Sequence, residues 1–235
     1  MTTPQIPLRL VRWPSPGLDD FLPTDAPAVA QLRGWLQHPD SHVLLRGPAG
    51  CGKTHLLEAV LRSLGGSGPQ PAYLPLAALG TAAAGMVGLQ PAVAVVAVDD
   101  LDEVRVDETL QHALFALHNR VVDAGGWMLY ACRGRPSDWT EVLPDLRSRL
   151  GQALQIRIQP LDDGLRREWF RRRAAALGLS LDDTAVEYLL RRVGRDLPGL
   201  QRLLERIDRD SLAQKRRLTV PFLRDLLAAD DGSAA

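Results

Sequence analysis

Apolar residues gather in five short runs that are separated by longer mixed segments. Each run is apolar almost throughout instead of alternating, which is typical of strands buried on both faces of a sheet. The runs are His42–Arg46, Ala72–Leu76, Val93–Val98, Trp127–Cys132 and Leu154–Ile158. Helical stretches lie between them, such as His55–Leu64 and Leu110–Asp123. Alternating strands and helices predict an α/β fold: a five-stranded, mostly parallel sheet with helices on both faces and ligands at the carboxyl ends of its strands.

From about Leu161 the pattern changes to helices alone. Asp162 or Asp163 can begin one helix and Asp182 or Asp183 a second, because aspartate side chains accept hydrogen bonds at helix starts. A third helix is expected at about Leu200–Lys215, and a last one after Thr219. The expected organisation is an extended arm at 1–17, an α/β core at 18–160 and a small all-helical subdomain at 161–235.

Composition narrows the function classes only slightly. The 235 residues carry 28 basic and 28 acidic side chains, so net charge does not steer the chain toward nucleic acid. Apolar runs are shorter than a membrane span of about 20 residues, and the start has no signal-peptide pattern. The two cysteines, Cys51 and Cys132, have no metal-ligand spacing. A cytoplasmic protein that contacts no membrane is expected.

A glycine-rich loop follows the first predicted strand and opens a helix. It reads Gly47-Pro48-Ala49-Gly50-Cys51-Gly52-Lys53-Thr54. In such loops backbone N–H groups surround phosphate oxygens, the lysine reaches the β and γ phosphates, and the threonine hydroxyl is a ligand of Mg²⁺. The alternative is a plain strand-to-helix turn. The strand before and the helix after favour binding of ADP or ATP with Mg²⁺.

The third predicted strand ends in two acids, Asp99 and Asp100. A carboxylate at a strand's carboxyl end can hold Mg²⁺ through water, and a neighbouring carboxylate can orient an attacking water. Asp99 is the candidate metal partner and Asp100 the candidate water-activating group. An acidic turn without a catalytic role is the alternative.

These motifs occur in an order that resembles a known family. The loop, Asp99-Asp100, the segment Leu143-Pro144-Asp145-Leu146-Arg147-Ser148-Arg149-Leu150 and a helical lid resemble the AAA+ module of the bacterial replication initiator DnaA. The chain looks more similar still to DnaA-related AAA+ proteins of the Hda type, which promote regulatory inactivation of the initiator. The resemblance covers Gln5 to about Leu227 and implies an AAA+ P-loop NTPase core followed by the lid. It includes no helix-turn-helix DNA-binding domain, so specific DNA binding is not expected.

The resemblance also implies roles for particular residues. Arg149 falls at the arginine finger, which is supplied to ATP bound by a neighbour, here the initiator DnaA. Gln5, Ile6, Leu8 and Leu10 look like the peptide that binds the DNA polymerase sliding clamp. The resemblance allows a homodimer.

Each of these roles has a plainer alternative. Arg149 can be an ordinary surface arginine of a helix, and the arm can pack back on its own domain. Phe21 resembles the residue beside the adenine and is equally a candidate core anchor.

Two departures from the family pattern bear on hydrolysis. Arg133 occupies the polar sensor position after the fourth strand, and Pro198 aligns with the nucleotide-sensing arginine of the lid. Arg195 or Arg202 are the residues that could replace it. The expected function is therefore negative regulation of replication initiation by an adaptor with weak intrinsic hydrolysis. The alternative is a self-assembling AAA+ ATPase of the helicase-loader type.

Overall fold

The computed structural model describes residues 17–22, 26–65, 70–192, 197–214 and 223–224. Five strands form one sheet in the order β2-β3-β4-β1-β5, and every pairing is parallel. This arrangement confirms the predicted α/β class. The strands are β1 (Val43–Arg46), β2 (Ala72–Pro75), β3 (Val95–Asp99), β4 (Trp127–Cys132) and β5 (Leu154–Arg157).

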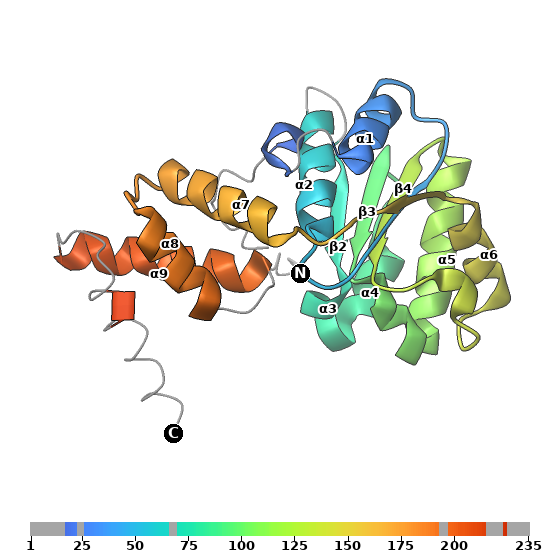
Figure 1. Cartoon of the computed structure of the whole chain (residues 1–235). Coiled ribbons are helices and arrows are strands. Elements are labelled where there is room, and N and C mark those ends of the chain that lie inside the picture. Colours follow the sequence, from blue (N-terminus) through green and yellow to red (C-terminus); the bar gives the residue numbers. More distant parts are fainter. Residues whose placement is uncertain (1–16, 23–25, 66–69, 193–196, 215–222, 225–235) are drawn as a thin grey trace, which may run out of the picture.

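Helices cover both faces of the sheet (Figure 1). They are α1 (Pro27–Gln37), α2 (Lys53–Leu64), α3 (Leu76–Leu79), α4 (Ala83–Leu89), α5 (Glu108–Asp123) and α6 (Pro144–Gln152). One buried cluster joins α1 and α2 to one face, and a second joins α4, α5 and α6 to the other. The central strands β3 and β4 are almost entirely apolar because both of their faces are buried in this way. The edge strand β5 differs from the predicted apolar run, because only Ile156 of its four residues is buried.

The helical part that follows has a core of its own. It contains α7 (Asp163–Ala176), α8 (Asp183–Arg192) and α9 (Leu197–Gln214), packed around residues such as Phe170, Leu189 and Leu204. Asp162 accepts a hydrogen bond from the Leu165 N–H, which fixes Asp162 as the first cap. Because Asp182 does the same for the Ala185 N–H, it is the second cap.

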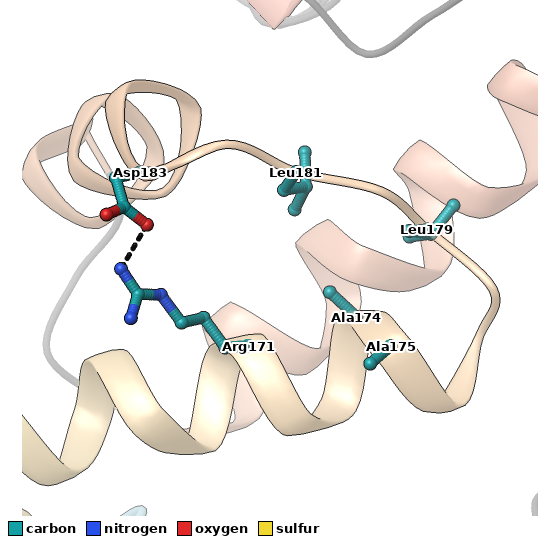
Figure 2. A pocket seen from close by; sticks show the side chains of 6 residues that line it. All are labelled: Arg171, Ala174, Ala175, Leu179, Leu181 and Asp183. Atoms are coloured by element: carbon teal, nitrogen blue, oxygen red, sulfur yellow. Dashed lines mark hydrogen bonds and ion pairs between the residues drawn. The ribbon is translucent and has the colours of Figure 1, made fainter.

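Two details of the helical part differ from or extend the prediction. Helix α9 begins three residues before the predicted Leu200. Most of the expected last helix lies outside the described residues. A pocket of about 320 Å³ lies beside α7, with the Arg171–Asp183 ion pair on one side and the apolar side chains of Ala174 and Leu179 on the other (Figure 2). Among the described residues no helix is long and apolar enough to cross a membrane.

A cluster of aromatic and histidine side chains lies at the amino end of β1 and β4. The buried His118 Nδ1 lies 2.7 Å from the Tyr130 hydroxyl oxygen, and the His42 ring packs edge-on against the His118 ring at 4.7 Å between centroids. The Met128 N–H donates to His42 Nδ1. Burial, together with the charges of His42 and Arg149, lowers the pKa of His118 to about 4. His118 is therefore held neutral inside the fold.

This cluster predicts acid-sensitive stability. Between pH 6.5 and 4 the unfolded chain binds a proton at residue 118 that the folded chain does not, so the free energy of unfolding falls as pH falls. His118 is expected to account for a loss of about 2 to 3 kcal/mol between pH 7 and 4.5. Urea unfolding of the wild type and of His118→Gln at both pH values measures the contribution of His118 to this loss. Glutamine keeps a hydrogen-bond acceptor but does not titrate. Equal losses in the two proteins would contradict the assignment.

Candidate functional site

The glycine loop leaves the carboxyl end of β1 and enters α2 by a path that requires glycine. Gly50 and Gly52 have φ angles of 72° and 98°, in the left-handed region that side chains disfavour. A Cβ on Gly52 would lie 2.7 Å from Phe21 Cε2, and a Cβ on Gly47 would lie 2.4 Å from the backbone oxygen of Ile158. Neither position has room for a larger residue without movement of its neighbours.

The ammonium group of Lys53 lies inside this loop. Its Nζ donates to the backbone oxygens of Gly47 at 2.8 Å and Pro48 at 2.9 Å. Within the described part of the chain, the N–H groups of residues 49, 50 and 52 donate to no acceptor. Free N–H groups and a lysine at a helix N-terminus are the donors that phosphate oxygens accept. The loop therefore fits the phosphate chain of a nucleotide, with the exposed Thr54 in the first turn of α2.

Asp99 lies buried at the carboxyl end of β3 and is only 2% exposed. The Tyr73 hydroxyl donates to its Oδ2 at 3.0 Å, and the Asp100 N–H donates to its Oδ1 at 2.9 Å. Burial raises the pKa of Tyr73, and the charge of Asp99 adds to this effect. Tyr73 therefore stays a hydrogen-bond donor, and the carboxylate of Asp99 is held by both of its oxygens.

Asp100 has an unusual backbone. With φ 52° and ψ 44° it is the one non-glycine residue among those described that has positive φ. Such strain costs about 1 to 3 kcal/mol and tends to occur at functional sites. Burial raises the pKa of the Asp100 carboxyl, the charge of Asp99 raises it further, and the charge of Arg133 opposes both. A carboxyl shifted in this direction is suited to general-base chemistry.

A magnesium ion fits this arrangement through the nucleotide. The described residues contain no group of three or more histidine, cysteine or acidic side chains that could hold a metal by themselves. Thr54 and Asp99 are the residues that would hold Mg²⁺ together with phosphate oxygens. Because both oxygens of Asp99 already accept hydrogen bonds, contact through water is the arrangement they favour.

The two departures from the family pattern lie in different elements. Arg133 follows β4; its N–H donates to Asp102 Oδ2 at 2.8 Å, and its charge acts on Asp100. Pro198 lies in the first turn of α9, where a backbone without an N–H is tolerated. Arg202 is an exposed residue of the same helix, whereas Arg195 lies outside the described residues.

Phe21 and His55 meet beside the loop. Phe21 is 7% exposed and belongs to the cluster under α1 and α2, and its ring centroid lies 5.8 Å from that of His55. The Nε2 atom of His55 is buried without a partner, and burial lowers the pKa of His55. Phe21 is thus a core anchor that also contacts the loop at Gly52. Sequence reasoning missed His55, although it directly follows Thr54.

Arg149 lies on α6, with its side chain exposed. Its charge lowers the pKa values of His42 and His118, and His42 immediately precedes β1. The loop begins at the other end of β1, and the five residue steps from His42 to Gly47 span about 16 Å. The structure therefore does not bring Arg149 together with the loop, Asp99 and Asp100 of its own chain. The expected clamp-binding residues Gln5, Ile6, Leu8 and Leu10 lie outside the described residues.

The fold as a whole is that of an AAA+ module. Domain III of the replication initiation protein DnaA from Thermotoga maritima matches with a TM-score of 0.76 at 17% identity, over 92% of this chain and 97% of that one. AMPPCP-bound DnaA from Aquifex aeolicus matches with a TM-score of 0.64 at 18% identity, over 82% of this chain and 65% of that one. The Holliday junction branch migration motor RuvB from T. maritima gives 0.61 at 20% identity, over 86% and 66%. The chain thus spans about two thirds of the longer structures it matches.

The helical subdomain resembles the lid of a particular family. Residues 163–227 match the family model described as "Hda, lid domain". The lid of this chain is therefore similar to the Hda lid, and its overall fold is similar to that of domain III of DnaA.

The bond between Tyr73 and Asp99 gives a testable prediction for the site. Tyr73→Phe leaves one oxygen of a buried carboxylate without its donor, which is expected to lower the free energy of unfolding by about 1 to 3 kcal/mol. Urea unfolding of Tyr73→Phe, Asp99→Asn and the double variant measures the coupling between the two residues. Strictly additive losses would show that the hydroxyl does not hold the carboxylate.

Proposed function

We propose that this chain is a nucleotide-bound AAA+ adaptor that restrains the initiation of DNA replication. It docks on the DNA-loaded sliding clamp through residues 5–10 and presents Arg149 to ATP bound by the initiator DnaA. The initiator then hydrolyses its ATP. The match of residues 163–227 to the Hda lid supports this assignment of partners.

The observation that carries the proposal is the position of Arg149. An arginine finger stabilises charge on the γ-phosphate of a nucleotide held by a neighbouring subunit. Arg149 is exposed on α6, and its charge acts on His42 at the amino end of β1, whereas the chain's own loop lies at the carboxyl end. An arginine so placed is suited to action on a partner.

The chain's own nucleotide, ADP or ATP with Mg²⁺, has a conformational role in this proposal. Lys53 and the free N–H groups of the loop bind its phosphates. Burial lowers the pKa of His55, which follows Thr54 directly, and the charge of Arg173 on the first lid helix α7 adds to this effect. A nucleotide in the loop thereby affects the position of the lid relative to the core.

The finger is tested in a reconstituted assay that contains clamp, DNA and ATP-bound initiator. Arg149→Ala is expected to lower the stimulated rate of ATP hydrolysis by at least about 100-fold, because a finger contributes a factor of about 10³ to 10⁵ in related systems. Arg149→Lys is expected to recover only a small part, since lysine lacks the planar fork.

The matched control is Arg62→Ala, which removes an exposed arginine from α2 on the opposite face of the sheet. It should leave the stimulated rate unchanged. Full stimulation by Arg149→Ala would refute the finger. Rapid ATP turnover by the purified chain alone, abolished by Asp100→Asn, would favour the self-assembling ATPase instead.

The arm is tested separately, by retention of the chain on immobilised clamp. A variant with Gln5→Ala and Leu8→Ala should lose retention at least about tenfold, because it removes an amide that can hydrogen-bond and an apolar anchor. Thr3→Ala, just outside the peptide, is the control and should bind normally. Equal retention of all three proteins would remove the arm from the mechanism.

A further inference from the structure

A second polar pocket lies on the α6 side of the sheet, next to the residue that precedes the glycine loop. It has a volume of about 360 Å³ and is lined by Arg46, Arg135, Pro136, Ser137, Gly151 and Gln155. These residues come from four parts of the fold: β1, the connection after β4 with its short helix Pro136–Asp138, α6, and β5. The pocket therefore has a wall fixed by the sheet and a wall fixed by a helix.

Arg46 lies in this pocket without a counter-charge. Its Nε atom is buried and has no hydrogen-bond partner, and it forms no ion pair with any described residue. Its register partners on the two neighbouring strands are Cys132 and Arg157, and neither supplies a negative charge. Burial raises the pKa of Cys132 to about 12, so that its thiol is neutral near pH 7. A buried guanidinium N–H without an acceptor costs about 1 to 3 kcal/mol, which a bound anion would recover.

Two other polar side chains around the pocket, those of Ser137 and Gln155, already have hydrogen-bond partners, whereas Arg135 has no ion pair among the described residues. The Ser137 hydroxyl donates to Asp138 Oδ1 at 3.0 Å, so the one acid of this short helix faces Ser137. The Gln155 Nε2 donates to the backbone oxygens of Leu150 and Ala153, which satisfies carbonyls at the end of α6. The guanidinium of Arg135 is exposed and has no ion pair within the described part of the chain.

We propose that the pocket between Arg46 and Arg135 is a binding site for a phosphate group. Two guanidinium forks match a dianion in charge, and each can donate two parallel hydrogen bonds to its oxygens. A single carboxylate would leave one positive charge uncompensated in the pocket. This proposal does not depend on the function proposed above.

The site is tested in a Lys53→Ala background, which weakens phosphate binding at the loop. Isothermal titration with inorganic pyrophosphate is expected to show one remaining site, and adding Arg135→Gln should weaken its affinity about tenfold or more. Titration with adenosine monophosphate distinguishes a site for free phosphates from one for nucleotide phosphates. Acetate, a monoanion, should bind at least about tenfold more weakly than pyrophosphate.

Gly151 offers an independent variant that does not touch either arginine. A Cβ at this position meets nothing within 4 Å, so Gly151→Glu can place a carboxylate in the pocket without a clash. It should abolish pyrophosphate binding, while Gly151→Gln, of the same shape but neutral, should weaken binding less. Arg62→Gln, on the other face of the sheet, controls for the loss of one positive charge and should bind as its parent does.

Each outcome of these titrations either supports the phosphate site or overturns it. Pyrophosphate binding that Arg135→Gln and Gly151→Glu both weaken, but Arg62→Gln does not, would establish the site. Absence of binding in the Lys53→Ala protein, equal affinity for acetate, or affinity unchanged by Arg135→Gln would overturn the proposal. Circular dichroism of each variant confirms that the chain is folded before titration.

Discussion

The close packing of β1 between β4 and β5 is the constraint on which the rest of the site depends. At the carboxyl end of β1 the Gly47 N–H donates to the Cys132 backbone oxygen, and the Ile158 N–H donates to the Arg46 backbone oxygen at 2.8 Å. The chain can turn into the loop at this point only because Gly47 has no Cβ. The loop is thereby fixed relative to the strand ends that carry Arg133 and the start of the lid, so the loop, Arg133 and the lid share one support.

Strand β1 separates the loop that fits phosphate from the cluster of histidines. Its carboxyl end continues into the loop that fits phosphate, and its amino end lies beside His42 and His118, on which the charge of Arg149 acts. A parallel strand buried on both faces is a stiff spacer, because shifting it would break hydrogen bonds on both sides. A chain built in this way has the loop that fits phosphate at one end of the sheet and displays the exposed Arg149 toward the other. That separation is what an adaptor needs if the reaction takes place on its partner.

Sequence reasoning predicted most of the fold because the strands are buried on both faces. Runs such as Trp127–Cys132 read as apolar without interruption, and the glycine loop has a spacing that few other structures need. The sequence of helix α4 predicts a helix only weakly, because Gly85 and Gly88 lower its helix propensity.

The contacts that cross between strands could not be read from one segment. The hydrogen bond of Tyr73 to Asp99 requires knowledge that β2 lies next to β3, and the pocket at Arg46 requires knowledge of the order β4-β1-β5. Local patterns predict elements, whereas such contacts follow from topology. Lysine and threonine of the loop were predictable from spacing alone; the partners that hold Asp99 were not.

The distribution of arginines connects the candidate sites. In the lid, arginines are paired with acids: Arg166 with Asp163, Arg167 with Glu187, Arg171 with Asp183 and Arg172 with Glu168. On or beside the α6 side of the core, Arg46, Arg135, Arg149 and Arg157 are among the arginines that form no ion pair with any described residue. Acidic side chains such as Asp138 and Asp145 lie in the same part of the fold, so its charge is mixed. Since fields from exposed charges act within about 10 Å at ordinary salt, these arginines act on an anionic group of a partner or ligand only at short range.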